Sequence, residues 1–196
     1  MGHAGGTLAR RRWRAWVAAV VVVPLLLGLA AADAKVFLAK DEALALAFPD
    51  AERIESTVFF VTDAQKAEIE RRARAPLESK LWTIYVGRRG EMVLGYAVLD
   101  SHVVRTLPET FMVVLEPDGR VRRVEVLAFY EPTEYLPPER WIAQFEGRAP
   151  EDRLDVGSGI QGITGATLSA QAMTAGVRRA RALVAVLMRR AAAGGR

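Results

Sequence analysis

Four glycines lie among hydroxyl side chains in residues 157–169, G-S-G-I-Q-G-I-T-G-A-T-L-S, directly before a segment with helical periodicity. A glycine-rich loop that runs into a helix leaves backbone N–H groups without partners at the positive end of the helix dipole. Such a junction favours the binding of a phosphate group. Glycine also permits φ > 0 and a close approach of a flat ligand. The candidate contacts for a phosphorylated ligand are Gly162, Thr164, Gly165, Thr167 and Ser169.

The same residues exclude two common nucleotide sites. Residues 157–169 contain no Lys, so the loop is not the P-loop of a nucleoside triphosphatase. A G-x-G-x-x-G motif after a strand is also missing, so a Rossmann site is not supported. A purely structural interpretation stays open, in which Thr164 or Thr167 caps the helix and the glycines only turn the chain.

Residues 164–169, T-G-A-T-L-S, resemble the [Ser/Thr]-Gly-Ala-Thr-x-[Ser/Thr] signature of FMN-binding domains that carry covalent flavin. Such domains occur in the flavoprotein subunits of Rnf complexes and sodium-pumping NADH:quinone reductases, in regulators of nitrous oxide reduction and in small exported flavoproteins. Residues 124–131, V-E-V-L-A-F-Y-E, are similar to the family's strand and acidic loop, and residues 141–147, W-I-A-Q-F-E-G, to its W-x-x-Q-F segment.

The resemblance implies that FMN is the cofactor and that Thr167 forms a phosphoester with it. It also implies a flavin transferase that installs FMN outside the cytoplasm from FAD with magnesium. The surrounding loop would be Thr164, Gly165, Ala166 and Ser169. One position departs from the family pattern, because Gln161 stands where the motif usually has Asp, six residues before the modified Thr. Loss of that carboxylate is expected to weaken recognition by the transferase or its metal.

A flavin ring needs an apolar or aromatic platform. The aromatic candidates are Phe129, Tyr130, Tyr135 and Trp141. Core packing is the favoured role for Phe129 and Trp141. Glu131 and Glu134 are candidates to contact the ribityl chain or the ring edge, with a solvated acidic loop as the alternative. His102 is interpreted as a surface or hairpin residue rather than a ligand.

The elements that position this loop are predicted to form an α+β domain. Turn signals at residues 88–90 and 116–119 separate β-branched runs, which indicates hairpins. Without βαβ alternation, the expected architecture is an antiparallel sheet of hairpins with flanking helices and a long C-terminal helix after the glycine-rich loop. The predicted strands are 55–61, 80–86, 92–99, 110–115 and 121–129, and the predicted helices are 40–47, 62–75, 139–146 and 167–190. Leu168 and Leu183 are among the apolar positions predicted to form one stripe of the last helix.

Composition narrows the chemistry further. The 196 residues include two His and no Cys, which excludes disulfides, thiolate zinc sites, iron–sulfur clusters and covalent haem. No acid–base pair, nucleophilic triad or metal-ligand set is apparent. The favoured hypothesis is therefore an FMN-carrying electron-transfer protein between a membrane-bound or periplasmic donor and acceptor, rather than an enzyme with its own substrate. A non-covalent FMN reductase or sensor and a flavin-free docking module are the alternatives.

The net charge of +4 is unevenly distributed. Residues 35–177 are acidic, at −5, and six arginines with no acid follow from Arg178 onward. A nucleic-acid binder would spread basic residues over one face with aromatic interleaving, so no nucleic-acid partner is expected. The six arginines are predicted to be a solvated helix face and a frayed end.

The N-terminal residues have the pattern of an export signal. Four arginines between Arg10 and Arg14 precede an uncharged apolar run over residues 15–32, and Ala32-Asp33-Ala34 follows. This order predicts a signal peptide cleaved after Ala34, or an N-terminal membrane anchor. The expected organisation is a leader over residues 1–34 and an FMN-binding domain over residues 35–196, exported to the periplasm or another extracytoplasmic space, with residues 15–32 as the anchor if it is retained.

Overall fold

The computed structural model describes residues 35–194, with side chains up to residue 188. The predicted leader, residues 1–34, lies outside the described residues. Within the described residues, no helix combines the length and the apolar character needed to cross a membrane.

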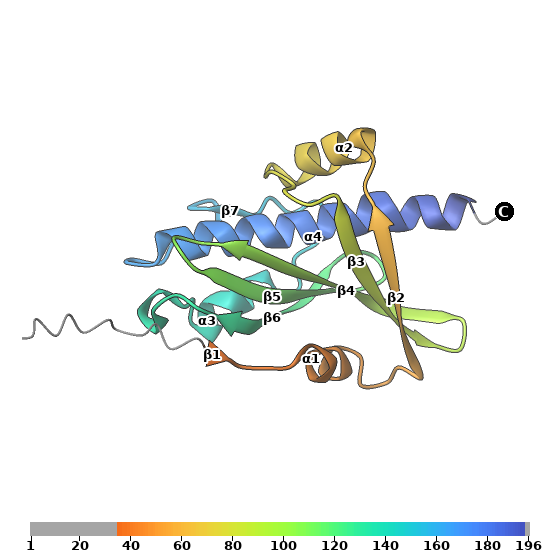
Figure 1. Ribbon diagram of the computed structural model, residues 1–196, viewed down its shortest axis with the longest axis horizontal. Coiled ribbons are helices and arrows are strands. Elements are labelled where there is room, and N and C mark those ends of the chain that lie inside the picture. Colours follow the sequence, from red (N-terminus) through yellow and green to blue (C-terminus); the bar gives the residue numbers. More distant parts are fainter. Residues whose placement is uncertain (1–34, 195–196) are drawn as a thin grey trace, which may run out of the picture. The chain divides into compact units, whose positions relative to one another are not determined.

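A six-stranded sheet forms the centre of the domain, and each strand is antiparallel to its neighbours (Figure 1). The strand order is β1-β6-β5-β4-β3-β2. Consecutive hairpins join β3 to β6, which confirms the antiparallel α+β class. The turn signals predicted the turns between β3 and β4 and between β5 and β6, but not the one between β4 and β5. The strands are β1 (Lys35–Val36), β2 (Arg53–Phe60), β3 (Leu81–Arg89), β4 (Met92–Val103), β5 (Pro108–Leu115) and β6 (Val121–Phe129). Of these, β1 has no counterpart among the predicted strands.

The helices surround this sheet. They are α1 (Lys40–Ala47), α2 (Asp63–Ala73), α3 (Glu139–Ile142) and α4 (Thr167–Gly194), and 3₁₀ turns cover Thr133–Tyr135 and Ala143–Phe145. Two short parallel strands, β7 (Asp155–Val156) and β8 (Gly159–Ile160), precede α4. A capping box between Thr62 and Gln65 begins α2. This helix ends at Ala73, earlier than predicted, because Arg74 adopts a left-handed conformation with φ +50°.

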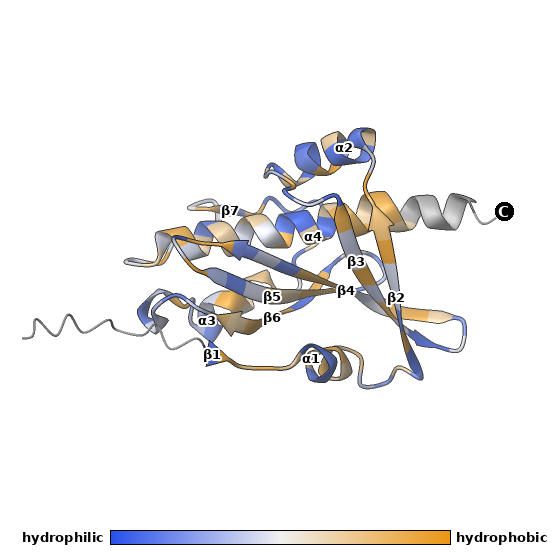
Figure 2. Cartoon of the chain, in the orientation of Figure 1, coloured by the Kyte–Doolittle hydropathy of each residue, from blue (hydrophilic) through white to orange (hydrophobic). Residues whose placement is uncertain are grey.

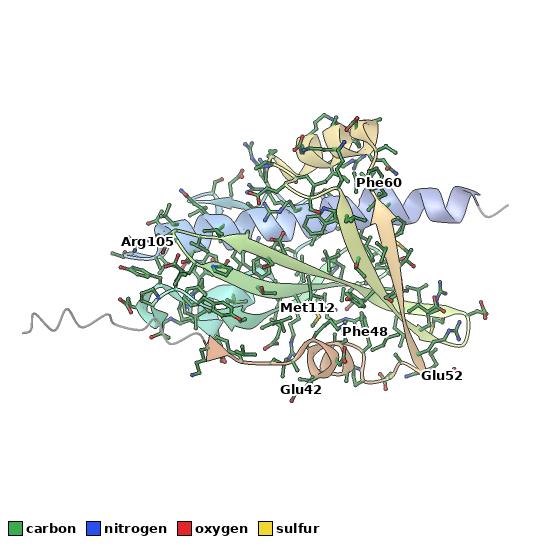
Figure 3. The ribbon with its side chains drawn as sticks, viewed as in Figure 1. Glu42, Phe48, Glu52, Phe60, Arg105 and Met112 are labelled. Atoms are coloured by element: carbon green, nitrogen blue, oxygen red, sulfur yellow. The ribbon has the colours of Figure 1, made fainter. Side chains whose placement is uncertain are left out.

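The two faces of the sheet pack against different helices. Ile84, Val98 and Phe111 belong to the larger core, which α2 and α4 cover. Met112 and Phe48, both labelled in Figure 3, belong to the smaller core beneath α1. Neighbouring residues of β5, such as Phe111 and Met112, belong to different cores because successive side chains of a strand point to opposite faces of the sheet. In Figure 2, polar residues dominate α2, whereas α4 carries both polar and apolar segments.

The buried stripe of α4 differs from the predicted one. Leu168 is 51% exposed, whereas Ala170, Met173 and Val177 are buried. The buried positions continue at spacings of three and four residues, as one helix face requires, and Leu168 falls off that face. The prediction of a solvated arginine face was also wrong for the three arginines whose side chains the structure describes; Arg189, Arg190 and Arg196 lie outside them. Arg178, Arg179 and Arg181 are partly buried, and each guanidinium binds carbonyl or carboxylate oxygens.

Gly176 allows α4 to approach the sheet closely. A Cβ atom at this position would lie 2.3 Å from Cζ of Phe111 and 3.2 Å from Cγ of Asp100. Phe111 is fully buried and cannot move freely.

We expect Gly176→Ala to destabilise the protein by about 1–3 kcal/mol, although Ala is the better helix former. Chemical denaturation of the variant measures this loss. Ala172→Gly, at a half-buried position of the same helix, is the matched control and should cost about 1 kcal/mol or less. A stabilised Gly176→Ala variant would show that the helix-to-sheet distance adjusts without cost.

Candidate functional site

The loop predicted to bind a phosphorylated ligand lies at the N-terminal end of α4. Thr164, Gly165 and Thr167 are exposed, whereas Ala166 and Ser169 are buried. Gly165 has φ +85°, and nothing lies within 4 Å of the position that its Cβ would occupy. The loop therefore presents hydroxyl groups and open backbone to the surface.

The first turn of α4 has backbone donors available. The first intrahelical bond joins the N–H of Ala170 to the carbonyl of Ala166 at 3.0 Å, so the three preceding N–H groups have no helical acceptor. The Thr167 hydroxyl donates to the Ile163 carbonyl at 3.5 Å instead of accepting from the helix. In the described part of the chain, neither Thr164 nor Thr167 caps α4 with its side chain. The alternative in which these residues serve only as caps therefore loses its support.

Ser169 adds a second observation that points to a ligand. Its side chain is 1% exposed, and its Oγ has no hydrogen-bond partner among the described residues. A buried hydroxyl without a partner is costly and calls for an explanation. The hydroxyls of Thr167 and Ser169, the N–H groups between them and the dipole of α4 suit a phosphate ester.

Residues 141–148 hold the preceding part of the loop in place. The indole Nε1 of Trp141 donates to the carbonyl of Gln161, and the N–H of Gln161 donates to Oε1 of Gln144 at 2.8 Å. Arg148 donates to the carbonyl of Gly159 at 2.8 Å. The W-x-x-Q-F segment thus fixes the backbone of Gln161, while the Gln161 side chain remains exposed.

The turn between β4 and β5, residues 104–107, lies at the same end of the domain. Tyr96, in the first half of β4, lines one cavity together with residues of α4 as far as Met188, whereas Asp100, further along β4, binds Arg179 nearer the N-terminus of the helix. β4 and α4 therefore run in opposite directions, which brings the β4–β5 turn toward the N-terminal end of α4. Arg105, in this turn, lies at that end in Figure 3.

Glu131 holds this turn. One of its oxygens, Oε1, accepts from the N–H groups of Arg105, Thr106 and Leu107 at 3.0, 2.7 and 2.9 Å. Burial would raise the pKa of Glu131, but these three donors lower it below its ordinary value. The structure therefore gives Glu131 a positioning role, and its contact with a ligand stays a prediction.

The aromatic candidates separate into two groups. Phe129 and Trp141 are 0% and 5% exposed and belong to the interior, in agreement with the role favoured for them. Tyr130 and Tyr135 are half-buried, and the guanidinium of Arg105 lies 4.5 Å from the ring centre of Tyr135. These two tyrosines remain candidates for a platform. Glu134 is exposed, which fits the solvated-loop alternative.

A cavity of about 900 Å³ lies away from this loop. It lies between α2, α4 and the segment before β7, and none of the predicted site residues lines it. Arg178 donates to the carbonyls of Ala73 and Leu154, and Arg181 to that of Ala149. These guanidinium groups already serve to connect backbone segments, so we assign the cavity no chemistry. Within the described residues, no cluster of three or more His, Asp or Glu side chains could hold a metal ion.

The interpretation of His102 was right about the hairpin, because His102 pairs with Glu109 across β4 and β5, but wrong about the surface. Its side chain is only 10% exposed and lies in a buried group with Asp100, Glu109 and Arg179. These residues come from two consecutive strands, β4 and β5, and from α4, which is distant from them in sequence. Only the alternation of Asp100 and His102 on one strand face could have indicated the group.

A comparison with protein families finds that residues 107–182 match the model of the FMN-binding domain. The match extends from β5 to the middle of α4 and includes all three segments on which the resemblance rests. No curated protein matches the chain.

Proposed function

Since residues 107–182 form an FMN-binding domain and FMN is its cofactor, we propose that the protein is an exported electron carrier with FMN esterified to Thr167. The observation that supports this most directly is the first turn of α4. This turn carries the exposed hydroxyl of Thr167, N–H groups without helical acceptors, and the buried hydroxyl of Ser169, which has no partner among the described residues.

The residues present fit the phosphate end of FMN. Thr167 would provide the attachment oxygen, and the N–H groups of the first turn with Ser169 would hold the phosphate oxygens. Thr164 and Gly165 would border the ligand on the exposed side. Bound flavin supplies transfers of one or two electrons. Residues 161–169 contain no titratable side chain, so they offer no acid or base for a substrate of their own, which favours a carrier.

Attachment requires a flavin transferase. The Thr167 hydroxyl would displace AMP from FAD, forming the FMN phosphoester as the pyrophosphate bond breaks and releasing the hydroxyl proton. A covalent bond would prevent loss of the cofactor in a compartment without a pool of free FMN. The arginines and apolar run of residues 10–32 support such a location, and membrane-bound or periplasmic proteins would serve as electron donor and acceptor.

The intact mass of the exported protein tests this function. We expect the protein, co-expressed with a flavin transferase, to gain the mass of one FMN less one water. Loss of residues 1–34 in the same spectrum would report cleavage after Ala34. A yellow protein without added mass would show that FMN is bound non-covalently. A colourless, unmodified protein would contradict the proposed carrier function.

The exposed Gln161 favours the second candidate, a non-covalent FMN protein, because the usual carboxylate is missing. We expect Gln161→Asp to raise the fraction of covalently modified protein, since its backbone is already fixed by Trp141 and Gln144. The modified fraction in the mass spectrum after a limited reaction time measures this. Ser158→Asp, which adds a carboxylate at another exposed position of the same loop, is the matched control. An unchanged fraction in Gln161→Asp would show that transfer does not depend on this carboxylate.

A further inference from the structure

Four charged side chains meet between α4 and the sheet. Arg179 of α4 forms a two-pronged contact with Asp100 of β4, with Nε and Nη2 at 2.8 and 2.9 Å from its two oxygens. Nδ1 of His102, also on β4, lies 2.8 Å from Oδ1 of Asp100. Glu109 of β5 faces the other side of the imidazole. Asp100 and Glu109 are each 1% exposed, so water does not solvate their carboxylates.

The contacts fix where protons must be. Asp100 is paired with Arg179 and is therefore an ionised acceptor, so Nδ1 of His102 carries a hydrogen and donates it. The remaining ring nitrogen, Nε2, lies 3.1 Å from Oε1 of Glu109. Without a proton on either atom, two lone pairs would face each other in a buried space.

We propose that His102 and Glu109 together form an interior binding site for one exchangeable proton, held at the contact between Nε2 and Oε1. With that proton the four side chains carry no net charge, whether it resides on the imidazole or on the carboxyl group. Without it a single negative charge would remain buried, which is strongly unfavourable. The contact lacks hydrogen-bond alignment, and neither oxygen of Glu109 has a partner among the described residues. The proton is therefore held by charge more than by a directed bond.

The surroundings support retention of the proton. Burial lowers the pKa of His102, but the hydrogen bond to Asp100 and the charges of Asp100 and Glu109 outweigh it and raise this pKa to about 9. Burial raises the pKa of Glu109, and the charges of Asp100 and Glu131 act in the same direction. The Phe111 ring packs against His102 in an edge-to-face arrangement, with 5.5 Å between ring centres, and brings no charge.

A gap in the sheet gives the proton a path to solvent. Pairing between β3 and β4 ends at Ile84 and Val98, although β3 begins at Leu81 and β4 continues to Val103. The two strands diverge there (Figure 1). A cavity of about 330 Å³ occupies this gap, and Asp100, His102 and Arg179 contribute to its lining. The site is thus buried but open to exchange on one side.

The site connects the β4–β5 hairpin to α4, because Asp100 contacts both Arg179 of the helix and His102. His102 in turn contacts Glu109 of β5. Loss of the proton would weaken this connection. The inference does not depend on the proposed flavin function, and the protein without cofactor tests it.

The experiment is an NMR titration of the histidine ring signals in the cofactor-free protein. The chain has only two histidines, so His3→Ala assigns the signal of His102. We expect His102 to titrate near pH 9 rather than near its ordinary 6.5. Glu109→Gln should lower this pKa by about 1–2 units, because the amide donates to Nε2 and makes a second ring proton unnecessary.

Glu125→Gln is the matched control, since Glu125 pairs only loosely with Arg123 at the surface, at 3.7 Å, and should leave His102 unchanged. Titration of wild-type His102 at or below pH 6.5 would overturn the proposal. The same holds if Glu109→Gln, shown to be folded by its spectrum, leaves the pKa of His102 unaltered. If Glu109→Gln does not fold, the wild-type titration decides alone.

Discussion

Thr167→Ala should abolish covalent attachment of FMN completely. A phosphoester needs one oxygen nucleophile, and alanine removes it without altering the backbone of the first turn of α4. Thr167→Ser keeps the hydroxyl and should be modified, although its freer χ1 angle is expected to slow the transfer. The measurement is the intact mass after co-expression with the flavin transferase, followed by mapping of the modified peptide.

Two controls separate chemistry from folding. Thr167 is exposed, so its replacement should change the free energy of unfolding by no more than about 0.5 kcal/mol. Thr164→Ala removes a neighbouring exposed hydroxyl of the same loop and should still yield one FMN per chain. An adduct that persists in Thr167→Ala, or disappears in Thr164→Ala but not in Thr167→Ala, would place the attachment at another residue.

The sequence predicted the glycine-rich loop and its helix well because local rules govern both. Gly165 provides the positive φ that the turn needs, and α4 begins at Thr167 as predicted. The hairpin over residues 116–119 was equally predictable from its Pro-Asp-Gly turn. Features of this kind depend on residues adjacent in the chain.

Predictions that depended on tertiary contacts were less successful. Arg178, Arg179 and Arg181 were predicted to be solvated, but their long side chains reach carbonyl and carboxylate oxygens on segments up to 105 residues away in sequence. Glu131 and His102 were assigned from residue type alone. The partners of these two residues, the β4–β5 turn and the group around Asp100, become visible only when the strand register is known.

Asp100→Ala should be among the most destabilising single substitutions in the domain, at about 3–5 kcal/mol. It removes the carboxylate that accepts from both Arg179 and His102, and leaves the two cationic groups buried without it. Denaturation by urea should show a lower midpoint with a similar slope. Glu125→Ala, which removes an exposed carboxylate paired at 3.7 Å, is the control and should cost about 0–1 kcal/mol.

The double variant Asp100→Leu with Arg179→Met tests whether Asp100→Ala is destabilised by the charge of Arg179 that it leaves buried and unpaired. Replacing both partners by apolar side chains removes the buried charge of Arg179, so the double variant should be more stable than Asp100→Ala alone. If the double variant is no more stable than the single one, the loss arises from packing around Gly176 and Phe111 rather than from electrostatics.

The pH dependence of stability provides an independent test of the contributions of Asp100 and His102. Burial would raise the pKa of Asp100, but His102 and Arg179 lower it overall, so its contribution is present above about pH 4 and is lost on acidification. His102, with its pKa raised from 6.5 to about 9, contributes fully below pH 6.5 and loses that contribution as the pH rises through 9. Wild-type stability should therefore decline between pH 6.5 and 9. Asp100→Ala should flatten that decline, because the imidazolium loses one of the two carboxylates that hold its proton.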